Sequence, residues 1–423
     1  MKVRLLKDNW TLTVLGDNVY HIPETPIETT VPSTVYETLL KKKLMPDPFY
    51  RDNELDATKL MENEFLYETA FTIDEEERSA DRIFLHFDGI DTIADLYLND
   101  KKIGSAENMN RVWEYDITSL VKEDAEDNVY QLKVLLHSPI RYAAMEDQKC
   151  PVGAASDAMP GFPHIRKAAC MYGWDSGPRL PDAGLFRCVS LVSVKTARMA
   201  QVMIAQKHHI IGKTVHGNVV DAVRLTADAE IEWMPDKAKI VMTVVAPDGT
   251  VCQRAESNWI DQETESAPSA CLTGLTCALR SNHVKASLLV ENPKLWWPNG
   301  YGEQNLYQVK VELVTEEVKD IQQPLKVHVL DVWEKKIGLR TITVNTDLME
   351  DEVYDSHMVG QKDDVDDGRN MLLSEGDRMV AIVDKSEKKV KGRNFAYEVN
   401  GLQIFAMGAD YIPEDNILTR QNR

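Results

Sequence analysis

Short runs of β-forming residues, several of them alternating apolar and polar, constrain the fold of this chain most strongly. Residues 83–87, 93–98 and 130–136 show this composition in the first half, and 240–245, 284–290 and 307–313 repeat it beyond residue 200. Turn-forming segments such as Asn99-Asp100 and Pro247-Asp248-Gly249 separate the runs. Strands at short spacing without alternating helices argue against a doubly wound sheet and predict a mainly β chain of two successive sandwiches.

One early helix interrupts the strand pattern. Thr34 and Glu37 have the spacing of a capping box, and Val35, Leu39 and Leu40 form an apolar face. We expect this helix to end before Pro46.

The charge balance excludes some partners. The 423 residues carry 48 Lys and Arg against 68 Asp and Glu, a net charge of -20. Nucleic acids and anionic membrane surfaces require basic patches, so neither is expected as a partner. No stretch reaches the roughly 18 apolar residues of a membrane span, and no apolar signal segment follows Met1, which predicts a soluble, cytoplasmic protein. Six scattered cysteines and unpartnered histidines predict neither a disulfide framework, a metal site nor a cofactor.

Residues 345–391 differ in composition from the rest. They contain 13 acidic and 7 basic residues with few apolar positions, which predicts a solvated or partly disordered insertion. Apolar pattern returns over 395–405, where Asn400-Gly401 is a strong hairpin signal.

Two segments have the composition of a functional or tightly packed loop. Residues 172–181 combine Gly, Pro, aromatic rings, Asp175 and Arg179, the residue types that bind sugars; a packed turn at a sandwich end is the alternative. Residues 292–307 contain Trp296-Trp297 near a Pro-Asn-Gly turn, for which a structural role is favoured. Ser176 lacks the glycine spacing of a nucleophile elbow, and no phosphate-binding glycine loop is present.

Five motifs in order resemble the β-mannosidase branch of glycoside hydrolase family 2. They are Asp47-Pro48-Phe49-Tyr50, Tyr172-Gly173-Trp174-Asp175, residues 295–307, Gly338-Leu339-Arg340-Thr341-Ile342, and Val399-Asn400-Gly401 with residues 408–413. The resemblance implies a jelly-roll sugar-binding domain over 1–197 and an immunoglobulin-like sandwich over 198–344. The acidic insertion over 345–391 follows, and then the first hairpin and strand of a TIM barrel over 392–423, with residues 404–407 as that strand.

The resemblance also suggests which residues contact the sugar. In the family, the aspartate that corresponds to Asp175 reaches from the first domain into the active site. Trp174 beside it and Tyr411 near the end of the first barrel strand are further candidates for substrate binding. Three positions depart from the family pattern: Ser176 and Phe186 stand where tryptophan is common, and Asp410 stands where asparagine is usual.

Catalysis in this family requires residues that the sequence does not supply. Retaining hydrolysis uses two carboxyl groups about 5 to 5.5 Å apart, and the family places both on later strands of a barrel of roughly 250 residues. Only 79 residues follow position 344, and no acidic residue matches either glutamate, so no catalytic residue is assigned. The sequence therefore predicts the non-catalytic N-terminal region of a retaining β-mannosidase, whose partner is a β-mannoside or manno-oligosaccharide. A free-standing carbohydrate-binding or scaffold protein and a family 2 glycosidase of another specificity are the alternatives.

Overall fold

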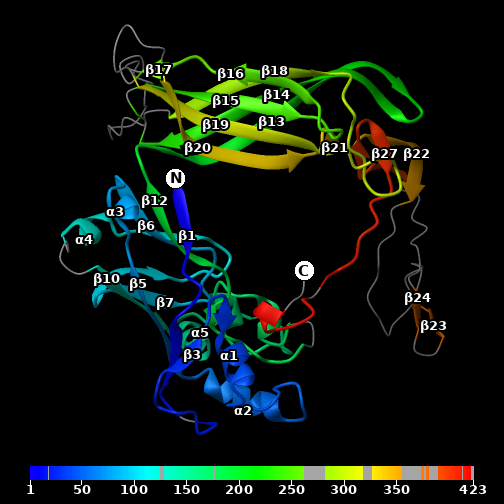
Figure 1. The fold of residues 1–423 in the computed structure, drawn as a ribbon. Helices are drawn as coiled ribbons and strands as arrows, with labels where there is room; N and C mark the ends of the chain where they lie inside the picture. Colours follow the sequence, from blue (N-terminus) through cyan, green and yellow to red (C-terminus); the bar gives the residue numbers. More distant parts are fainter. Residues whose placement is uncertain are drawn as a thin grey trace, which may run out of the picture.

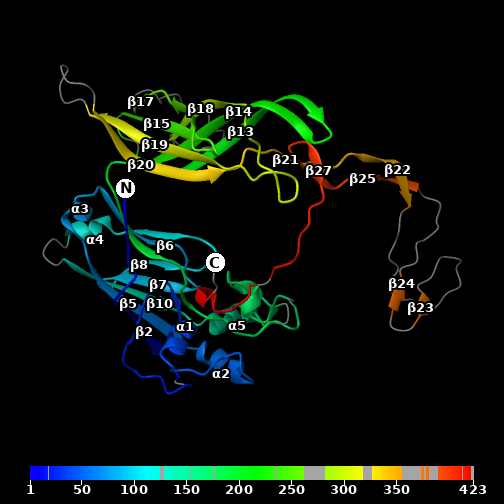
Figure 2. The same ribbon diagram turned by 45° about the vertical axis from the view of Figure 1, so that its right-hand side comes forward.

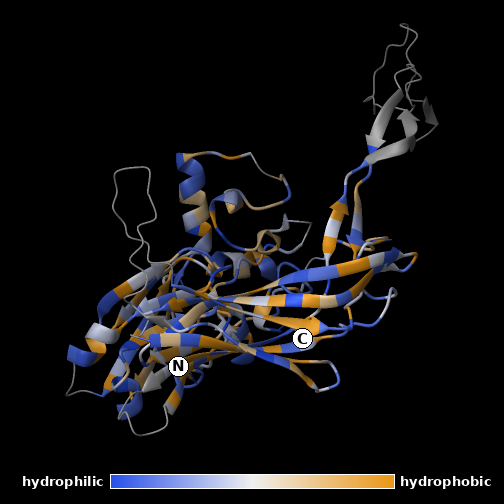
Figure 3. Cartoon of the chain, turned by 90° about the horizontal axis from the view of Figure 1, so that it is seen from above, coloured by the Kyte–Doolittle hydropathy of each residue, from blue (hydrophilic) through white to orange (hydrophobic). Residues whose placement is uncertain are grey.

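Two β-sandwiches carry most of the described chain, one above the other in the view of Figure 1. The computed structural model describes all residues except 18, 124–127, 154, 175–176, 234, 236, 262–281, 318–325, 355–372, 376–377, 381–388, 412 and 421–423. Apolar and polar residues alternate along the strands (Figure 3), as expected for sheets with one face on a core. The predicted mainly β fold with two sandwiches is confirmed.

The first sandwich packs a four-stranded sheet, in the order β1-β12-β6-β9, on a six-stranded sheet, in the order β3-β2-β5-β10-β7-β8. The strands of the first sheet are β1 (Lys2–Leu5), β6 (Arg82–Phe87), β9 (Trp113–Asp116) and β12 (Val189–Val194). Those of the second are β2 (Trp10–Leu15), β3 (Ile27–Thr29), β5 (Glu64–Thr72), β7 (Ala94–Leu98), β8 (Lys101–Ala106) and β10 (Val129–Leu136). A short pair, β4 (Ser33–Thr34) with β11 (Gly184–Leu185), lies beside them.

Strand β10 shows why the sequence pattern predicts the sheet. Tyr130, Leu132, Val134 and Leu136 are all fully buried, whereas the residues between them are not. Because β10 lies between β5 and β7, both of its edges are hydrogen-bonded. The alternating run therefore supplies one central strand of the core.

Short helices cover one end of this sandwich (Figure 2). They are α1 (Val35–Lys41), α2 (Asn53–Leu60) and α5 (Pro139–Lys149); α3 (Glu75–Arg78) and α4 (Thr118–Glu123) lie elsewhere on it. The Thr34 side chain caps α1 by accepting from the Glu37 amide at 3.2 Å, as predicted. The helix ends at Lys41, before Pro46.

The second sandwich packs a sheet in the order β13-β14-β18 on one in the order β16-β15-β19-β20, with β17 beside β15. Its strands are β13 (Arg198–Thr214), β14 (Gly217–Glu232), β15 (Lys237–Val245), β16 (Val251–Glu256), β17 (Ile260–Asp261), β18 (His283–Glu291), β19 (Tyr307–Glu317) and β20 (Lys326–Ile337). Its apolar core runs from Ala197 to Leu339. The predicted domain boundaries at residues 197 and 344 stay predictions.

Arg198, the first residue of β13, connects the two sandwiches. Its guanidinium donates to both oxygens of Glu114 on β9, at 2.6 and 3.0 Å, and to Glu232 on β14 at 2.6 Å. Burial alone would raise the pKa of Glu114, but the hydrogen bonds from His86 and Arg198 outweigh it and lower the pKa to about 2. Since Glu114 and Glu232 belong to different sandwiches, one cation links both.

The last part of the chain adds small sheets after the second sandwich, of which β23 and β24 lie away from it (Figure 1). They are β21 (Ile342–Asn345) with β26 (Ala396–Val399) and β27 (Leu402–Ile404), β22 (Leu348–Tyr354) with β25 (Lys389–Arg393), and β23 (Leu373–Glu375) with β24 (Arg378–Val380). The acidic insertion thus contains paired strands among its described residues; the cluster at 363–368 lies outside them.

The predicted hairpin at Asn400-Gly401 is confirmed, with φ of +50° and +75°. Asn400 fixes it on the second sandwich, because its side chain donates to the Trp296 carbonyl and accepts from the Thr341 amide. The barrel strand expected over 404–407 stays a prediction. After Ile404 no strand partner follows among the described residues, and Phe405 and Met407 are exposed.

No helix among the described residues is long and apolar enough to cross a membrane.

Candidate functional site

The loop that contains Trp174 lies at the end of the first sandwich and is built on an aromatic stack. The ring of Phe162 lies 6.4 Å from that of Tyr172 and 6.3 Å from that of Trp174, centre to centre. Tyr172 is buried and its hydroxyl donates to the Pro139 carbonyl at 3.3 Å, which anchors the stack. Trp174 at the outer end is 41% exposed, so part of its ring faces solvent. An aromatic ring held in this way can stack on the C–H face of a sugar.

A backbone bridge joins the two sides of the loop that contains Trp174. Tyr172 and Arg179 form an isolated antiparallel bridge, which holds the chain before and after the loop together. Gly173 has φ of +88°, and a Cβ at this position would meet the Arg179 side chain at 2.8 Å. Glycine is therefore required there. Asp175 and Ser176 follow Trp174 in the sequence and lie outside the described residues.

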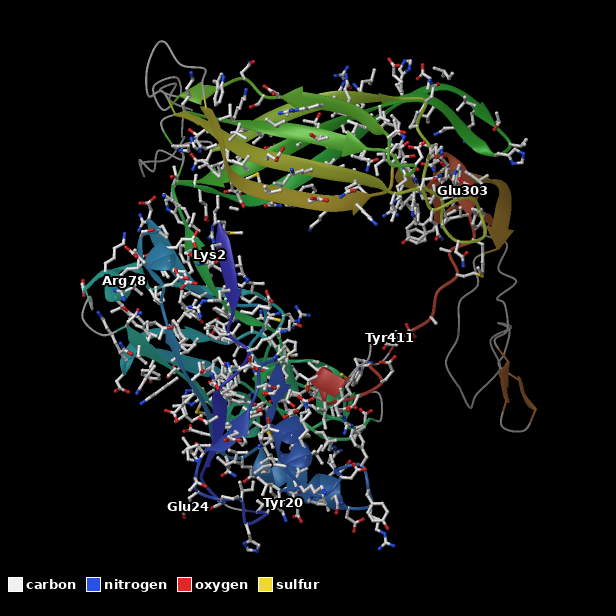
Figure 4. The ribbon with its side chains drawn as sticks, in the orientation of Figure 1. Lys2, Tyr20, Glu24, Arg78, Glu303 and Tyr411 are labelled. Atoms are coloured by element: carbon white, nitrogen blue, oxygen red, sulfur yellow. The ribbon has the colours of Figure 1, made fainter. Side chains whose placement is uncertain are left out.

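The C-terminal segment returns to the same loop. After β27 it crosses from the second sandwich to the first (Figure 4). There the Asn416 side chain donates to the Pro178 carbonyl at 2.9 Å. Ile417 is fully buried in the first core, and the Arg420 guanidinium lies 5.4 Å from the centre of the Phe49 ring. The segment that follows the second sandwich therefore packs against the Trp174 loop.

Tyr411 lies on this returning segment and is labelled in Figure 4. Its side chain is 72% exposed, and a hydrogen bond with Glu414 raises its pKa. The segments of Trp174 and Tyr411 meet at Pro178, so the structure brings two of the three predicted sugar-binding residues to one end of the first sandwich. Their roles stay predictions.

A buried polar cluster of Asp91, Lys167 and Asp182 lies next to the ends of the Trp174 loop. The sequence analysis did not predict it. The Lys167 side chain is fully buried; it donates to the Asp91 carboxylate and, at 2.6 Å, to the Asp182 carbonyl. The Asp182 carboxylate accepts from the amides of Tyr36 and Ala183, at 3.1 and 2.8 Å. Burial raises the pKa of Asp182 to about 7, although these amides and the Lys167 charge oppose the rise.

This cluster carries no sequence signal, because its three residues come from separate segments with ordinary turn composition. Its geometry suggests a positioning role. Asp91 and Gly184 exchange two backbone hydrogen bonds of 2.9 Å, so the cluster fixes the chain just after the Trp174 loop. All three groups lie too deep to contact a substrate.

Trp296 and Trp297 pack against the backbone of the second sandwich. The Trp296 side chain lies against Gly338 and under the Arg340 guanidinium, 4.2 Å from the ring centre, while Trp297 lies against Gly302. Both contacts agree with the structural role expected for this pair.

Metal binding and disulfides have no support in the described part of the chain. There, no group of three or more His, Cys, Asp or Glu side chains is arranged to hold a metal ion. His209 instead pairs with Asp221 at 2.6 Å. Cys150, Cys170, Cys188 and Cys252 are not joined in disulfide bonds.

Two family models match the chain. A model described as "Glycosyl hydrolase 2 galactose-binding domain-like" matches residues 10–187, and one described as "Glycosyl hydrolases family 2" matches residues 219–340. The first contains the Trp174 loop and the second covers most of the second sandwich.

Similar curated proteins extend over nearly the whole chain. A β-mannosidase B of Aspergillus terreus is 28% identical over 396 residues, which are 92% of this chain and 36% of that protein. A β-mannosidase of Mus musculus is 24% identical over 397 residues, again 92% of this chain and 36% of that protein. The chain spans about two fifths or less of the length of the curated relatives it matches.

A solved structure has the same fold. The β-D-mannosidase of Dictyoglomus thermophilum superimposes with a TM-score of 0.70 at 23% identity and covers 100% of this chain, which in turn covers 41% of that protein.

Proposed function

Because the chain belongs to glycoside hydrolase family 2, we propose that it is the sugar-recognising N-terminal region of a β-mannosidase that releases terminal β-mannose with retention. The observation that carries the proposal is the extent of similarity to curated β-mannosidases, which covers 92% to 98% of this chain. The clustering of the Trp174 loop with the segment of Tyr411 supports it, since separate parts of the chain then meet at one sugar.

In this proposal the residues of the chain bind and orient the sugar. Asp175 accepts hydrogen bonds from sugar hydroxyls, Trp174 packs on a C–H face and Tyr411 borders the site. The nucleophile and the acid/base of a retaining mechanism are two carboxyl groups about 5 to 5.5 Å apart, and we assign neither to this chain. Binding of this kind lowers the barrier by holding the glycosidic bond in position for those groups.

A chimera tests the sugar contact. The chain would replace the matching part of the Aspergillus terreus β-mannosidase B, and hydrolysis of p-nitrophenyl β-D-mannoside would be measured. We expect Asp175→Asn to lower kcat/KM by about 10- to 100-fold, the effect of weakening a charge-assisted hydrogen bond. Asp157→Asn serves as the matched control, because Asp157 is exposed and lies beside the loop, where its backbone carbonyl accepts from Arg179 at 2.9 Å. Equal activity of a folded Asp175→Asn chimera and its parent would contradict the assignment.

The alternative of a free-standing carbohydrate-binding protein makes a different prediction for the 423-residue chain alone. We expect this chain not to hydrolyse p-nitrophenyl β-D-mannoside, because none of its carboxylates matches a family glutamate. Calorimetric titration with mannobiose then separates the two functions. Binding that Asp175→Asn and Trp174→Ala both abolish would favour the free-standing protein. If the chain hydrolysed this substrate and replacement of one of its own acidic residues abolished the hydrolysis, the non-catalytic role would be refuted.

A further inference from the structure

A cavity of about 700 Å³ opens on the first sandwich between β2, β3 and α1. This volume is in the range of small-molecule sites. None of residues 172–187 lines it, so it is distinct from the Trp174 loop. Apart from Trp10, every residue that lines it has a polar or charged side chain, and the exposed wall combines carboxylate, hydroxyl and ammonium groups with apolar carbon atoms.

Within the described part of the chain, Glu37 is the residue in this wall whose carboxylate has an unsatisfied hydrogen-bond acceptor. It is 6% exposed, and its Oε1 accepts from the Lys41 ammonium at 2.7 Å. The other oxygen, Oε2, is buried and has no hydrogen-bond partner among the described residues. A buried polar atom without a partner costs about 1 to 3 kcal/mol, and more when it is charged. Oε2 has almost no exposed surface in this position, so a ligand hydroxyl reaches it when the Glu37 side chain rotates toward the cavity, and the resulting hydrogen bond would remove this cost.

Hydroxyl groups lie next to Glu37 along the wall. The Thr29 and Thr38 hydroxyls are 2.9 Å apart, and the Ser33 hydroxyl lies 3.4 Å from that of Thr29. Ser33 and Thr38 are themselves buried, so backbone packing holds them in place. Each hydroxyl both donates and accepts, which suits a ligand whose groups do the same.

The rim of the cavity adds a weak, exposed ion pair. The Lys42 ammonium lies 3.7 Å from the Glu28 carboxylate, whose side chain is 90% exposed. Exposed pairs contribute only about 0 to 1 kcal/mol. A ligand can therefore separate the two groups at small cost and use the ammonium as a donor and the carboxylate as an acceptor.

These observations narrow the class of ligand. An anion such as phosphate would face the buried Glu37 carboxylate, and the described residues offer no metal-binding group here. The wall places apolar carbon atoms beside its polar groups, which suits a molecule that carries both C–H and hydroxyl groups better than a wholly apolar compound, and the Trp10 ring itself is 1% exposed. We propose that the cavity binds a neutral polyhydroxylated molecule of monosaccharide to disaccharide size, with Glu37 Oε2 as its central acceptor. This site is additional to the Trp174 loop and does not depend on it.

Saturation-transfer NMR and calorimetry on the 423-residue chain test the proposal with three probes: D-mannose, D-galactose and mannobiose. We expect at least one probe to bind with a dissociation constant on the order of 1 mM. Glu37→Gln should weaken this binding at least tenfold. Thr38→Val, which removes one wall hydroxyl at nearly constant volume, should weaken it several-fold. Glu24→Gln, an exposed glutamate outside the cavity, is the matched control and should change nothing.

Comparing the binding of Glu37→Gln with that of Trp174→Ala shows whether a probe occupies the cavity or the Trp174 loop of the proposed function. Binding lost in Glu37→Gln and kept in Trp174→Ala supports the cavity. Binding kept in Glu37→Gln and lost in Trp174→Ala overturns the inference while leaving the proposed function intact, and so does the absence of binding by all three probes. If Glu37→Gln fails to fold, Glu28→Gln on the exposed rim combined with Thr38→Val decides in its place, and unchanged binding overturns the proposal.

Discussion

Replacement of Lys167 by methionine is expected to lower the free energy of unfolding by about 3 to 5 kcal/mol, the usual cost of breaking a buried ion pair from one side. Both members of the Lys167–Asp91 pair are fully buried, and the same ammonium donates to the Asp182 carbonyl. Methionine fills similar volume but leaves the Asp91 carboxylate without its cation. The loss is therefore electrostatic rather than a loss of packing. Urea unfolding followed by tryptophan fluorescence would measure it.

A surface lysine provides the matched control. Lys59 pairs with Asp56 at 3.0 Å on α2, with both side chains more than half exposed. Lys59→Met should cost less than about 1 kcal/mol. A double variant, Lys167→Met with Asp91→Asn, should recover part of the loss, because no buried charge is then left alone. If Lys167→Met lowered the free energy of unfolding no more than Lys59→Met, the cluster would not be what stabilises the chain after the Trp174 loop.

Local sequence signals predicted those elements whose stability comes from neighbouring residues. Thr34 caps α1 because its hydroxyl reaches the amide three residues on, and Asn400-Gly401 turns because both residues tolerate positive φ. The alternation of β10 likewise appears in its own residues. Each of these features can be seen in a window of a few residues.

Contacts between distant segments left no such signal. Asn416 reaches Pro178 across 238 positions, and Lys167 reaches Asp91 across 76. Arg198 joins Glu114 and Glu232 although nothing in its own surroundings indicates a bridge. Residues 404–407 depend on distant partners in the same way. The family resemblance predicts the first strand of a barrel there, and a strand needs a hydrogen-bonding partner, which the described residues after Ile404 do not supply. The motifs therefore located the candidate site, and only the fold shows how its parts meet.

The second large effect is a change in the pH dependence of stability at Asp182. Burial raises the pKa of this carboxyl from 3.8 to about 7, so the folded protein keeps a proton that the unfolded chain releases above pH 4. This contribution to stability is complete below about pH 4 and is lost as the pH rises through about 7. The difference between the two pKa values corresponds to roughly 4 kcal/mol. The carboxyl therefore makes unfolding easier at pH 8 than at pH 4.

Asp182→Asn should remove this pH dependence while preserving the local structure. The amide oxygen can still accept from Tyr36 and Ala183, and asparagine has nearly the same volume. Urea unfolding of both proteins from pH 4 to 8.5 would give the difference in free energy, in which all other titrating groups largely cancel. We expect the free energy of unfolding of the variant minus that of the parent to increase by a few kcal/mol from pH 4 to pH 7 and to remain constant above pH 7. Asp56→Asn, on the exposed surface of α2, should show no such gain. A constant difference between parent and Asp182→Asn across this range would mean that Asp182 is ionised in the folded protein at all these pH values.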